Sequence, residues 1–187
     1  MKALDRFLQR WRIGMAISFV RSGDRLLDVG CYDRSLIDRV LPRIESAVGV
    51  DIDVSPSVDD RVEIRQGHFP DVPRFQDSSF DCITMLAVLE HVDDPPALAM
   101  ECARILAQKG RLILTVPHPA VDTVLDALMF LGLVDGMSTE EHHGFDVRQT
   151  QEIFEDAGFL LSQKRMFQLG LNRLFVFEKA AEQSEMT

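Results

Sequence analysis

Two carboxylates stand where the ends of neighbouring strands are expected. Asp28 lies in the apolar run Arg25–Val29, which ends at Gly30, and Asp51 lies at the end of a second apolar run, residues 46–52. In an open parallel sheet, ligands bind beyond the carboxyl ends of the strands, where the strand order reverses. A carboxylate about 20 residues beyond the first strand end can accept hydrogen bonds from both hydroxyls of a ribose. This spacing indicates a site for a nucleoside-containing cofactor.

Histidines near other expected strand ends are candidates for proton transfer. His91 follows the fourth expected strand, His118 follows the fifth, and His142 and His143 precede the last expected helix. Imidazole titrates near neutral pH, so it suits a general base. For His91 we weigh a structural or cofactor-framing role against catalysis, and for His143 a substrate-facing role against a structural one. His118 is expected on the cofactor's side, and His142 in solvent.

Strand-like and helix-like segments alternate along the chain. Such alternation implies parallel crossovers, so we expect a Rossmann-like α/β fold: a three-layer αβα sandwich with a mostly parallel seven-stranded sheet and an antiparallel strand from a C-terminal hairpin. The expected strands are residues 25–29, 46–52, 62–65, 80–86, 111–116, 159–167 and 171–179. The expected helices are residues 1–22, 35–41, 95–106, 121–134 and 149–157, with Lys109-Gly110 closing the third.

Length, charge and cysteine content narrow the class of protein. The 187 residues fit one domain, and a net charge of -10 opposes binding to a phosphate backbone, so we expect no nucleic-acid partner. The three cysteines form no close pair, which favours a reducing, cytoplasmic setting. No apolar run reaches the roughly 18 residues of a transmembrane helix, and we see no secretion signal.

The first 25 residues differ in charge from the rest. They hold six basic and two acidic residues, a net charge of +4, so the remaining residues carry -14. The helix expected here has one apolar stripe and a basic face. This pattern indicates either a solvated helix packed on the domain, which is common, or contact with an anionic surface.

Five short motifs follow one another between residues 25 and 117. They are Leu26-Leu27-Asp28-Val29-Gly30-Cys31, Val48-Gly49-Val50-Asp51, Asp77-Ser78-Ser79-Phe80-Asp81, Val88-Leu89-Glu90-His91-Val92 and Lys109-Gly110-Arg111-Leu112. In this order they resemble the motifs of class I S-adenosylmethionine-dependent methyltransferases, nearest to the small-molecule enzymes of the type 11 branch. Residues 144–159 resemble the C-terminal part of that branch.

The resemblance implies a role for each motif in binding S-adenosylmethionine. The methionine part would face Asp28 and the loop Gly30, Cys31 and Tyr32, the ribose would bind Asp51, and adenine would lie on Ile52. The remaining cofactor contacts implied are Gly67, His68 and Phe69 around adenine, and the backbone of Met85, Leu86 and Ala87 near the sulfonium. For Phe69, simple core packing is an equal alternative.

Three departures from the family pattern bear on these roles. Tyr32 and Arg34 stand where the family usually has glycine, so either the loop has shifted, with Tyr32 over the methionine carboxylate and Arg34 paired to it, or the pocket binds the cofactor weakly. His68 replaces the usual acidic partner of adenine. The Glu-x-x-Glu-His of metal-dependent members is incomplete at Glu90-His91, so we expect no metal.

The function expected from the resemblance is methyl transfer to a small-molecule oxygen or nitrogen, with S-adenosylhomocysteine as product. Residues 1–187 would form a single domain: an N-terminal helix (1–22), a cofactor-binding half (25–117), a lid or insertion (118–147), a last helix and hairpin (148–179) and a tail. An apolar lid over 121–134 would favour an amphipathic acceptor, although core or dimer packing explains this apolar segment as well. The sequence does not decide whether the protein forms a homodimer.

The alternative function is that of a non-catalytic nucleoside-binding module. A nicotinamide dehydrogenase is disfavoured because Gly-x-Gly-x-x-Gly is absent.

Overall fold

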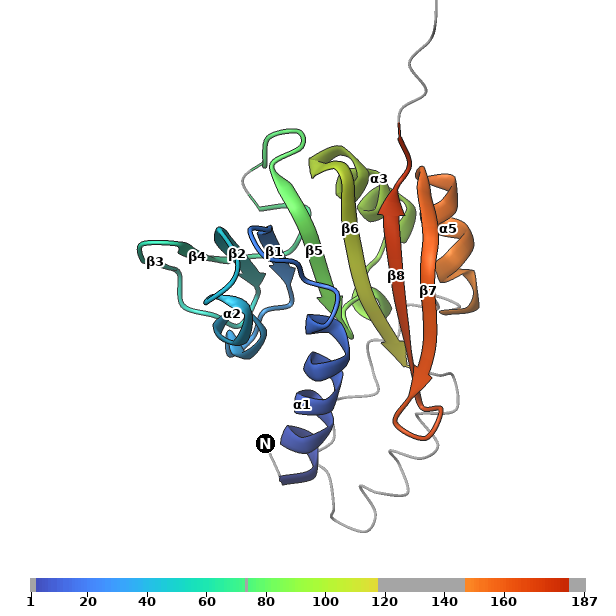
Figure 1. Ribbon diagram of the computed structural model, residues 1–187, viewed down its shortest axis with the longest axis horizontal. Helices are drawn as coiled ribbons and strands as arrows, with labels where there is room; N and C mark the ends of the chain where they lie inside the picture. The colour runs from blue at the N-terminus through green and yellow to red at the C-terminus, as the bar shows by residue number, and fades with distance from the viewer. Residues whose placement is uncertain (1–2, 73, 118–146, 182–187) are drawn as a thin grey trace, which may run out of the picture.

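The computed structural model describes residues 3–72, 74–117 and 147–181, and in these ranges one mixed sheet is formed. Its strands are β1 (Arg25–Val29), β2 (Ser46–Asp51), β3 (Ser57–Val58), β4 (Val62–Gln66), β5 (Phe80–Leu86), β6 (Leu106–Pro117), β7 (Phe159–Phe167) and β8 (Asn172–Lys179). They lie in the order β3-β4-β2-β1-β5-β6-β8-β7 (Figure 1). The five strands from β4 to β6 are parallel, whereas β3, β8 and their neighbours pair antiparallel.

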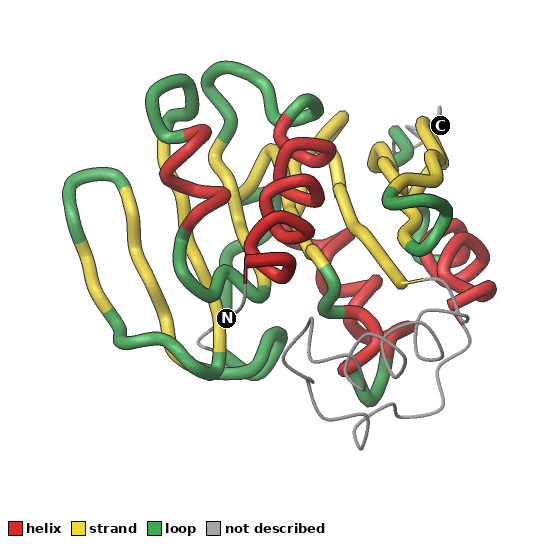
Figure 2. Tube along the Cα trace, turned by 90° about the horizontal axis from the view of Figure 1, so that it is seen from below, coloured by secondary structure: helices red, strands yellow, loops and turns green. Residues whose placement is uncertain are grey.

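Helices cover both faces of this sheet, as the view from below shows (Figure 2). The helices are α1 (Ala3–Ile17), α2 (Ser35–Val40), α3 (Pro95–Ile105) and α5 (Thr150–Asp156), with short 3₁₀ turns η1 (Leu89–His91) and η3 (Val147–Gln149). Local sequence sets their ends: the Asp94 carboxylate accepts a hydrogen bond from the Ala97 N–H at the start of α3, and Gly158 follows α5 with φ +89°. No helix in the described ranges is long and apolar enough to cross a membrane.

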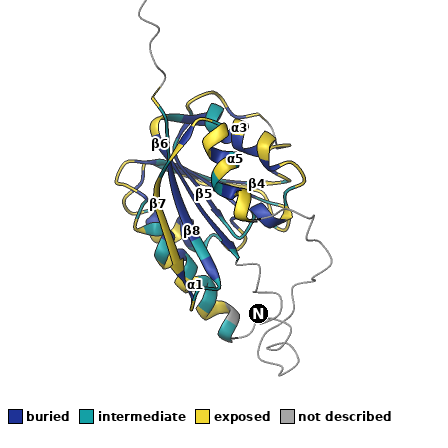
Figure 3. Ribbon diagram, turned by 90° about the vertical axis from the view of Figure 1, so that its right-hand side faces the viewer, coloured by how far each residue is buried: buried dark blue, intermediate teal, exposed yellow. Residues whose placement is uncertain are grey.

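Two apolar clusters hold the three layers together. Side chains alternate along each strand, so Leu27 and Val29 of β1 join the cluster that contains α3 and α5, while Leu26 joins the one that contains α1 and α2. The central strands are buried and β7 is exposed along most of its length (Figure 3). The sheet is therefore a packed platform that fixes where each strand end lies.

A buried ion pair lies near the amino ends of the strands, away from the expected cofactor site. Arg111 of β6 donates from Nη2 to both carboxylate oxygens of Asp24, at 2.6 and 2.5 Å, and both residues are buried. Asp24 also accepts a hydrogen bond from the Arg21 backbone N–H at 2.7 Å. These bonds join the turn before β1 to the middle of the sheet.

The expected fold class is confirmed, with two corrections. The sheet has eight strands in the described residues, not seven, because Ser57 and Val58 fold back on β4 as an additional antiparallel strand. Lys109-Gly110 does not close a helix: α3 ends at Ile105, and β6 begins at Leu106 and runs through these residues. The helix expected over 121–134 lies outside the described residues.

Replacing Asp24 by asparagine tests the buried ion pair. We expect Asp24→Asn to lower the free energy of unfolding by about 3–5 kcal/mol, because the Arg111 charge stays buried without its counter-charge. Urea denaturation measures this. The matched control is Glu178→Gln, which removes an exposed ion pair to Arg21 (3.7 Å) and should cost less than about 1 kcal/mol. Equal losses in the two variants would show that the buried pair is not a special constraint.

Candidate cofactor site

The strand order reverses between β1 and β5, and Asp28 lies at this position. β1 leads leftward to β2 and β4 in Figure 1, and β5 leads to β6 on the other side. Asp28 is in register with Thr84 of β5, whose hydroxyl donates a hydrogen bond to Asp28 Oδ1 at 2.6 Å. Both side chains are buried. Thr84 was not among the residues expected from the sequence, and it is the partner that fixes the Asp28 carboxylate.

The environment of Asp28 opposes its negative charge. Burial raises the pKa of Asp28 to about 7, the Thr84 hydrogen bond acts in the opposite direction, and the charges of Asp51 and Asp33 raise it further. A carboxylate held in this way gains from a positively charged ligand. The predicted position beside the amino acid end of a cofactor is chemically suitable, because an α-ammonium group would supply that charge.

The loop after β1 has three residues in the left-handed backbone region, and two of them are not glycine. Gly30, Tyr32 and Arg34 all have positive φ, at 74°, 42° and 62°. The Gly30 N–H donates to the Val50 carbonyl at 2.8 Å, and the Tyr32 N–H donates to Asp51 Oδ2 at 2.9 Å. These residues therefore adopt the left-handed backbone conformation that glycine favours, and the amides of Gly30 and Tyr32 are fixed against the end of β2.

The Tyr32 side chain lies largely in solvent, and the Arg34 side chain lies between two acidic residues. The Tyr32 side chain is 53% exposed, so its ring does not fill a closed pocket. Arg34 forms ion pairs with Asp59 at 3.3 Å and Asp38 at 3.4 Å, so it is engaged away from a ligand carboxylate. The expectation that Arg34 pairs with the cofactor's carboxylate is not supported by this arrangement.

Close packing also requires Gly30 itself. A Cβ added at Gly30 would collide with the Val88 side chain, which follows Ala87 at the end of β5. Cys31 turns its side chain into the apolar cluster beneath α1 and α2, and burial raises the pKa of its thiol to about 12. Cys31 is therefore a neutral packing residue, and only its backbone is available to a ligand.

Asp51 is oriented by the backbone on both sides. Its Oδ2 accepts from the Tyr32 N–H and its Oδ1 accepts from the Asp53 N–H at 2.9 Å. Each carboxylate oxygen has capacity for a further hydrogen bond. Ile52, the next residue, is 49% exposed and offers an apolar surface beside this carboxylate. The Asp51 carboxylate is suited to ribose hydroxyls, and the Ile52 side chain is suited to the flat base beside them.

The segment after β4 lies near this side of the site. The Gly67 N–H donates to the Asp51 carbonyl at 2.9 Å, which joins the end of β4 to the end of β2. His68 is exposed, whereas Phe69 is 9% exposed and packs with Phe75 at 6.4 Å between ring centroids. Of the two alternatives for Phe69, the core position is the one observed in the structure.

The end of β5 lies on the other side of β1 from β2 and β4, where the sulfonium of the cofactor is expected. Met85 is fully buried, Leu86 is partly buried, and Ala87 has φ 60° with its N–H bonded to the Thr115 carbonyl at 3.0 Å. His91 ends η1 and is exposed. His118, His142 and His143 lie outside the described residues, so the structure does not place these candidates.

Arg12 is a second residue that the sequence did not single out. It lies on α1, its Nε is buried, and no group in the described residues accepts a hydrogen bond from that atom. Burial lowers the pKa of the guanidinium, and the charge of nearby Glu90, itself buried in η1, opposes that effect. Helical amphipathicity alone did not reveal Arg12, because four other basic residues occur on the same segment up to Arg21.

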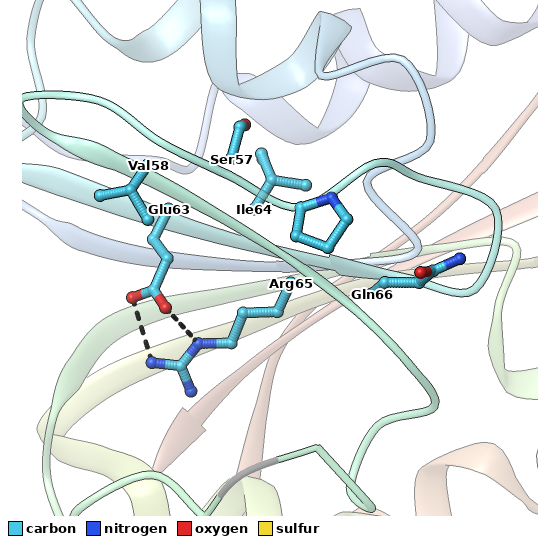
Figure 4. Close-up of a pocket in the computed structure, with 7 residues that line it drawn as sticks. Ser57, Val58, Glu63, Ile64, Arg65 and Gln66 are labelled. Atoms are coloured by element: carbon cyan, nitrogen blue, oxygen red, sulfur yellow. Dashed lines mark hydrogen bonds and ion pairs between the residues drawn. The ribbon is translucent and has the colours of Figure 1, made fainter.

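Two surface grooves lie apart from these residues. One lies along β3 and β4, where the Glu63 carboxylate accepts two hydrogen bonds from Arg65 (Figure 4). The other surrounds the Asp24–Arg111 pair. Neither groove is lined by a residue expected to bind the cofactor, and no group of three or more His, Cys, Asp or Glu in the described ranges is arranged to hold a metal ion.

The fold and the cradle at the ends of β1, β2 and β5 define a Rossmann-like domain of the class that binds a nucleoside cofactor. Residues 2–164 match the model of the methyltransferase domain family. The chain therefore belongs to this family, within the class I S-adenosylmethionine-dependent methyltransferases, and S-adenosylmethionine is the corresponding cofactor.

Curated relatives and solved structures agree with this assignment. The chain is 30% identical over 152 residues to a probable S-adenosylmethionine-dependent methyltransferase of Mycolicibacterium smegmatis, covering 73% of this chain and 58% of that protein. It is 33% identical over 105 residues to a ubiquinone biosynthesis O-methyltransferase of Xanthomonas oryzae pv. oryzae, covering 50% and 43%. The chain thus spans about half the length of these relatives.

Among solved structures, similarity extends over nearly the whole fold. A chain in the complex between the Haloferax volcanii Trm112 methyltransferase activator and a putative methyltransferase matches with a TM-score of 0.73 at 17% identity, covering 92% of this chain and 91% of that one. YcgJ of Bacillus subtilis matches with a TM-score of 0.66 at 18% identity, covering 92% and 99%. At these identities the similarity establishes the fold.

Replacing Tyr32 by glycine tests whether the loop is strained. A non-glycine residue at φ 42° costs about 1 kcal/mol, so Tyr32→Gly should leave the free energy of unfolding unchanged or raise it by up to about 1 kcal/mol, despite the flexibility of glycine in the unfolded chain. Chemical denaturation provides the measurement. Arg39→Gly, at an exposed position of α2, should lower it by about 1 kcal/mol. A loss at Tyr32 as large as that at Arg39 would contradict the strain.

Replacing Asp28 by asparagine should have opposite effects on stability and on binding. The folded pKa of about 7 exceeds the unfolded value of about 3.9, so the wild type loses stability as pH rises from about 4 to 7, and Asp28→Asn avoids this loss. Above pH 7 the ligand-free variant should be more stable by up to about 4 kcal/mol, because the two pKa values differ by about three units, while cofactor affinity falls. Melting curves from pH 4 to 8 check the first effect, with Asp60→Asn as the control at an exposed carboxylate that does not act on Asp28. A stability difference that does not vary with pH would be inconsistent with the raised pKa.

Proposed function

We propose that this domain transfers a methyl group from S-adenosylmethionine to an oxygen or nitrogen of a small-molecule acceptor. The observation that carries the proposal is the pair of oriented carboxylates, Asp28 and Asp51, at the ends of adjacent parallel strands. Between them the loop after β1 retains positive φ at Gly30 and Tyr32. This arrangement suits a ligand with a cationic amino acid end and a ribose.

The described residues supply a partner for each part of the cofactor. Asp28 would accept from the α-ammonium group, and Asp51 would accept from the ribose hydroxyls with the oxygen capacity that the backbone leaves. Ile52 would lie against adenine. Because Arg34 is paired with acidic side chains, Arg12 is the better candidate for the carboxylate, since its Nε has no partner in the described residues.

The chemical contribution of these residues would be mainly alignment. S-adenosylmethionine supplies an electrophilic methyl group on a sulfonium, and transfer requires the acceptor atom in line with the breaking bond. The backbone at Met85, Leu86 and Ala87 would limit the position of the acceptor near the end of β5. His91 is the described candidate for accepting an acceptor's proton, and His118 and His143 are further candidates from the sequence alone.

Support for a small-molecule acceptor comes from the relatives named for ubiquinone biosynthesis. The ubiquinone pathway named for these relatives is not carried over to this chain, which covers less than half of the Xanthomonas protein's length. The acceptor is therefore proposed only as a chemical class. Cytoplasmic location and a homodimer likewise stay predictions from the sequence.

A non-catalytic nucleoside-binding module is the second candidate. The substitution of glycine by Tyr32 and Arg34 favours it, because bulky residues restrict how closely a cofactor approaches the loop. The exposure of Tyr32, 53%, favours the enzyme, since an exposed ring does not fill the cofactor pocket. The two candidates share the binding step and differ in turnover.

Titration calorimetry with S-adenosylmethionine and S-adenosylhomocysteine tests the shared step. We expect both to bind, and Asp51→Ala to weaken binding at least about tenfold, because two hydroxyl hydrogen bonds to a charged acceptor are lost. Asp53→Ala is the matched control, since Asp53 is an exposed neighbour that serves Asp51 through its backbone N–H. Absence of binding by either nucleoside to the folded protein at millimolar concentration would refute the proposal. Binding without methyl transfer to any member of an acceptor panel would favour the non-catalytic module.

A further inference from the structure

The outward face of α1 carries two aromatic side chains that the domain does not bury. Phe7 is 57% exposed and Trp11 is 39% exposed. They are four residues apart, so they lie one turn above the other, and their rings meet edge to face at 5.9 Å. The inward face of the same helix places Ile13 and Ala16 in the apolar cluster beneath it. The aromatic pair is therefore an additional apolar feature on a helix that is already anchored.

A second row on this face is basic. Arg6 and Arg10 are exposed and also four residues apart, so they run beside the aromatic pair, and neither forms an ion pair with another residue in the described ranges. Of the other described basic residues of this segment, Arg21 pairs with Glu178 and Arg25 pairs with Asp81. Arg12 is turned inward, and its Nε is buried. Arg6 and Arg10 thus place two positive charges on this exposed helical face that no described acidic residue neutralises.

The turn between β7 and β8 brings a third apolar side chain to the same end of the domain. Gln168 in this turn donates from Nε2 to the Leu8 carbonyl of α1 at 2.8 Å, which joins the turn to the helix. The next residue, Leu169, is 96% exposed. In Figure 1 both α1 and this turn extend beyond the sheet at the edge where the carboxyl ends of β5 and β6 lie.

From this arrangement we infer that the outer face of α1, with Leu169 beside it, docks on an anionic lipid surface. Aromatic and leucine side chains enter the headgroup region of a bilayer, and arginines flanking them remain at the level of the phosphates. The charge distribution also sets the orientation, because the rest of the chain carries -14 and is repelled by the same surface. Docking would place the carboxyl-end edge of the sheet close to the membrane, where an amphipathic acceptor resides.

Trp11 is the sole tryptophan of the chain, so its emission reports on this face directly. With vesicles containing phosphatidylglycerol, the full-length protein should co-sediment, and the emission of Trp11 should shift to shorter wavelength. Vesicles of phosphatidylcholine alone should bind far less. Arg6→Glu with Arg10→Glu should lower the partition coefficient by about 30-fold or more, since each basic residue near the surface contributes on the order of 1 kcal/mol.

Matched variants separate this face from general charge effects. Arg39→Glu with Lys109→Glu changes the net charge equally at exposed positions of α2 and β6 and should leave binding within about twofold of the wild type. Phe7→Ser with Leu169→Ser retains Trp11 and should reduce both co-sedimentation and the emission shift. Far-ultraviolet circular dichroism verifies that each variant is folded.

Three results would overturn the inference. Emission and sedimentation unaffected by phosphatidylglycerol would exclude lipid as the occupant. Emission already at short wavelength without vesicles would mean that another copy or another segment of this chain covers Trp11. Equal loss of binding in the two charge-reversed pairs would mean that no particular face docks. None of these outcomes depends on methyl transfer, so failure of lipid binding can be distinguished from failure of the proposed methyltransferase activity.

Discussion

The hydrogen bond from the Tyr32 N–H to the Asp51 carboxylate is the constraint on which the site depends. It joins the loop after β1 to the end of β2, and it holds positive φ at residue 32 where glycine would adopt it without strain. The same bond orients Asp51, so the loop and the carboxylate have their positions set together. A backbone amide provides this orientation whatever side chain stands at position 32, and this explains how tyrosine is accommodated there.

Strain in the loop and the buried carboxylate of Asp28 are related features. Both are unfavourable in the ligand-free protein, one through backbone conformation and the other through desolvation, and both lie where a charged ligand is expected. Packing against the rest of the domain maintains them: Val88 lies over Gly30, and Thr84 donates to Asp28. A site of this kind is preformed, because its groups are already oriented before a ligand arrives.

Much of this arrangement could be predicted from the sequence, because it follows from local patterns. The apolar runs that end near Gly30 and Asp51 predict the ends of two strands. Because these strands pair in parallel, the carboxylates of Asp28 and Asp51 lie at the same edge of the sheet. The partners that come from distant parts of the chain could not be predicted. Thr84 is 56 residues from Asp28, and the inward orientation of Arg12 depends on how α1 packs, which periodicity does not reveal. The two-residue strand β3 is too short to leave a pattern.

The position of β8 has a consequence for the order in which the domain assembles during synthesis. β8 is the last described strand, yet it lies between β6 and β7 and pairs with β6 over seven residues, with Phe175 and Phe177 in the core. Until residues 172–179 leave the ribosome, the edge of β6 remains unpaired and its apolar side chains lack their cover. The five parallel strands are therefore synthesised before the strand that pairs with the edge of β6, and until β8 is available the sheet has an open edge of the kind that favours association between chains.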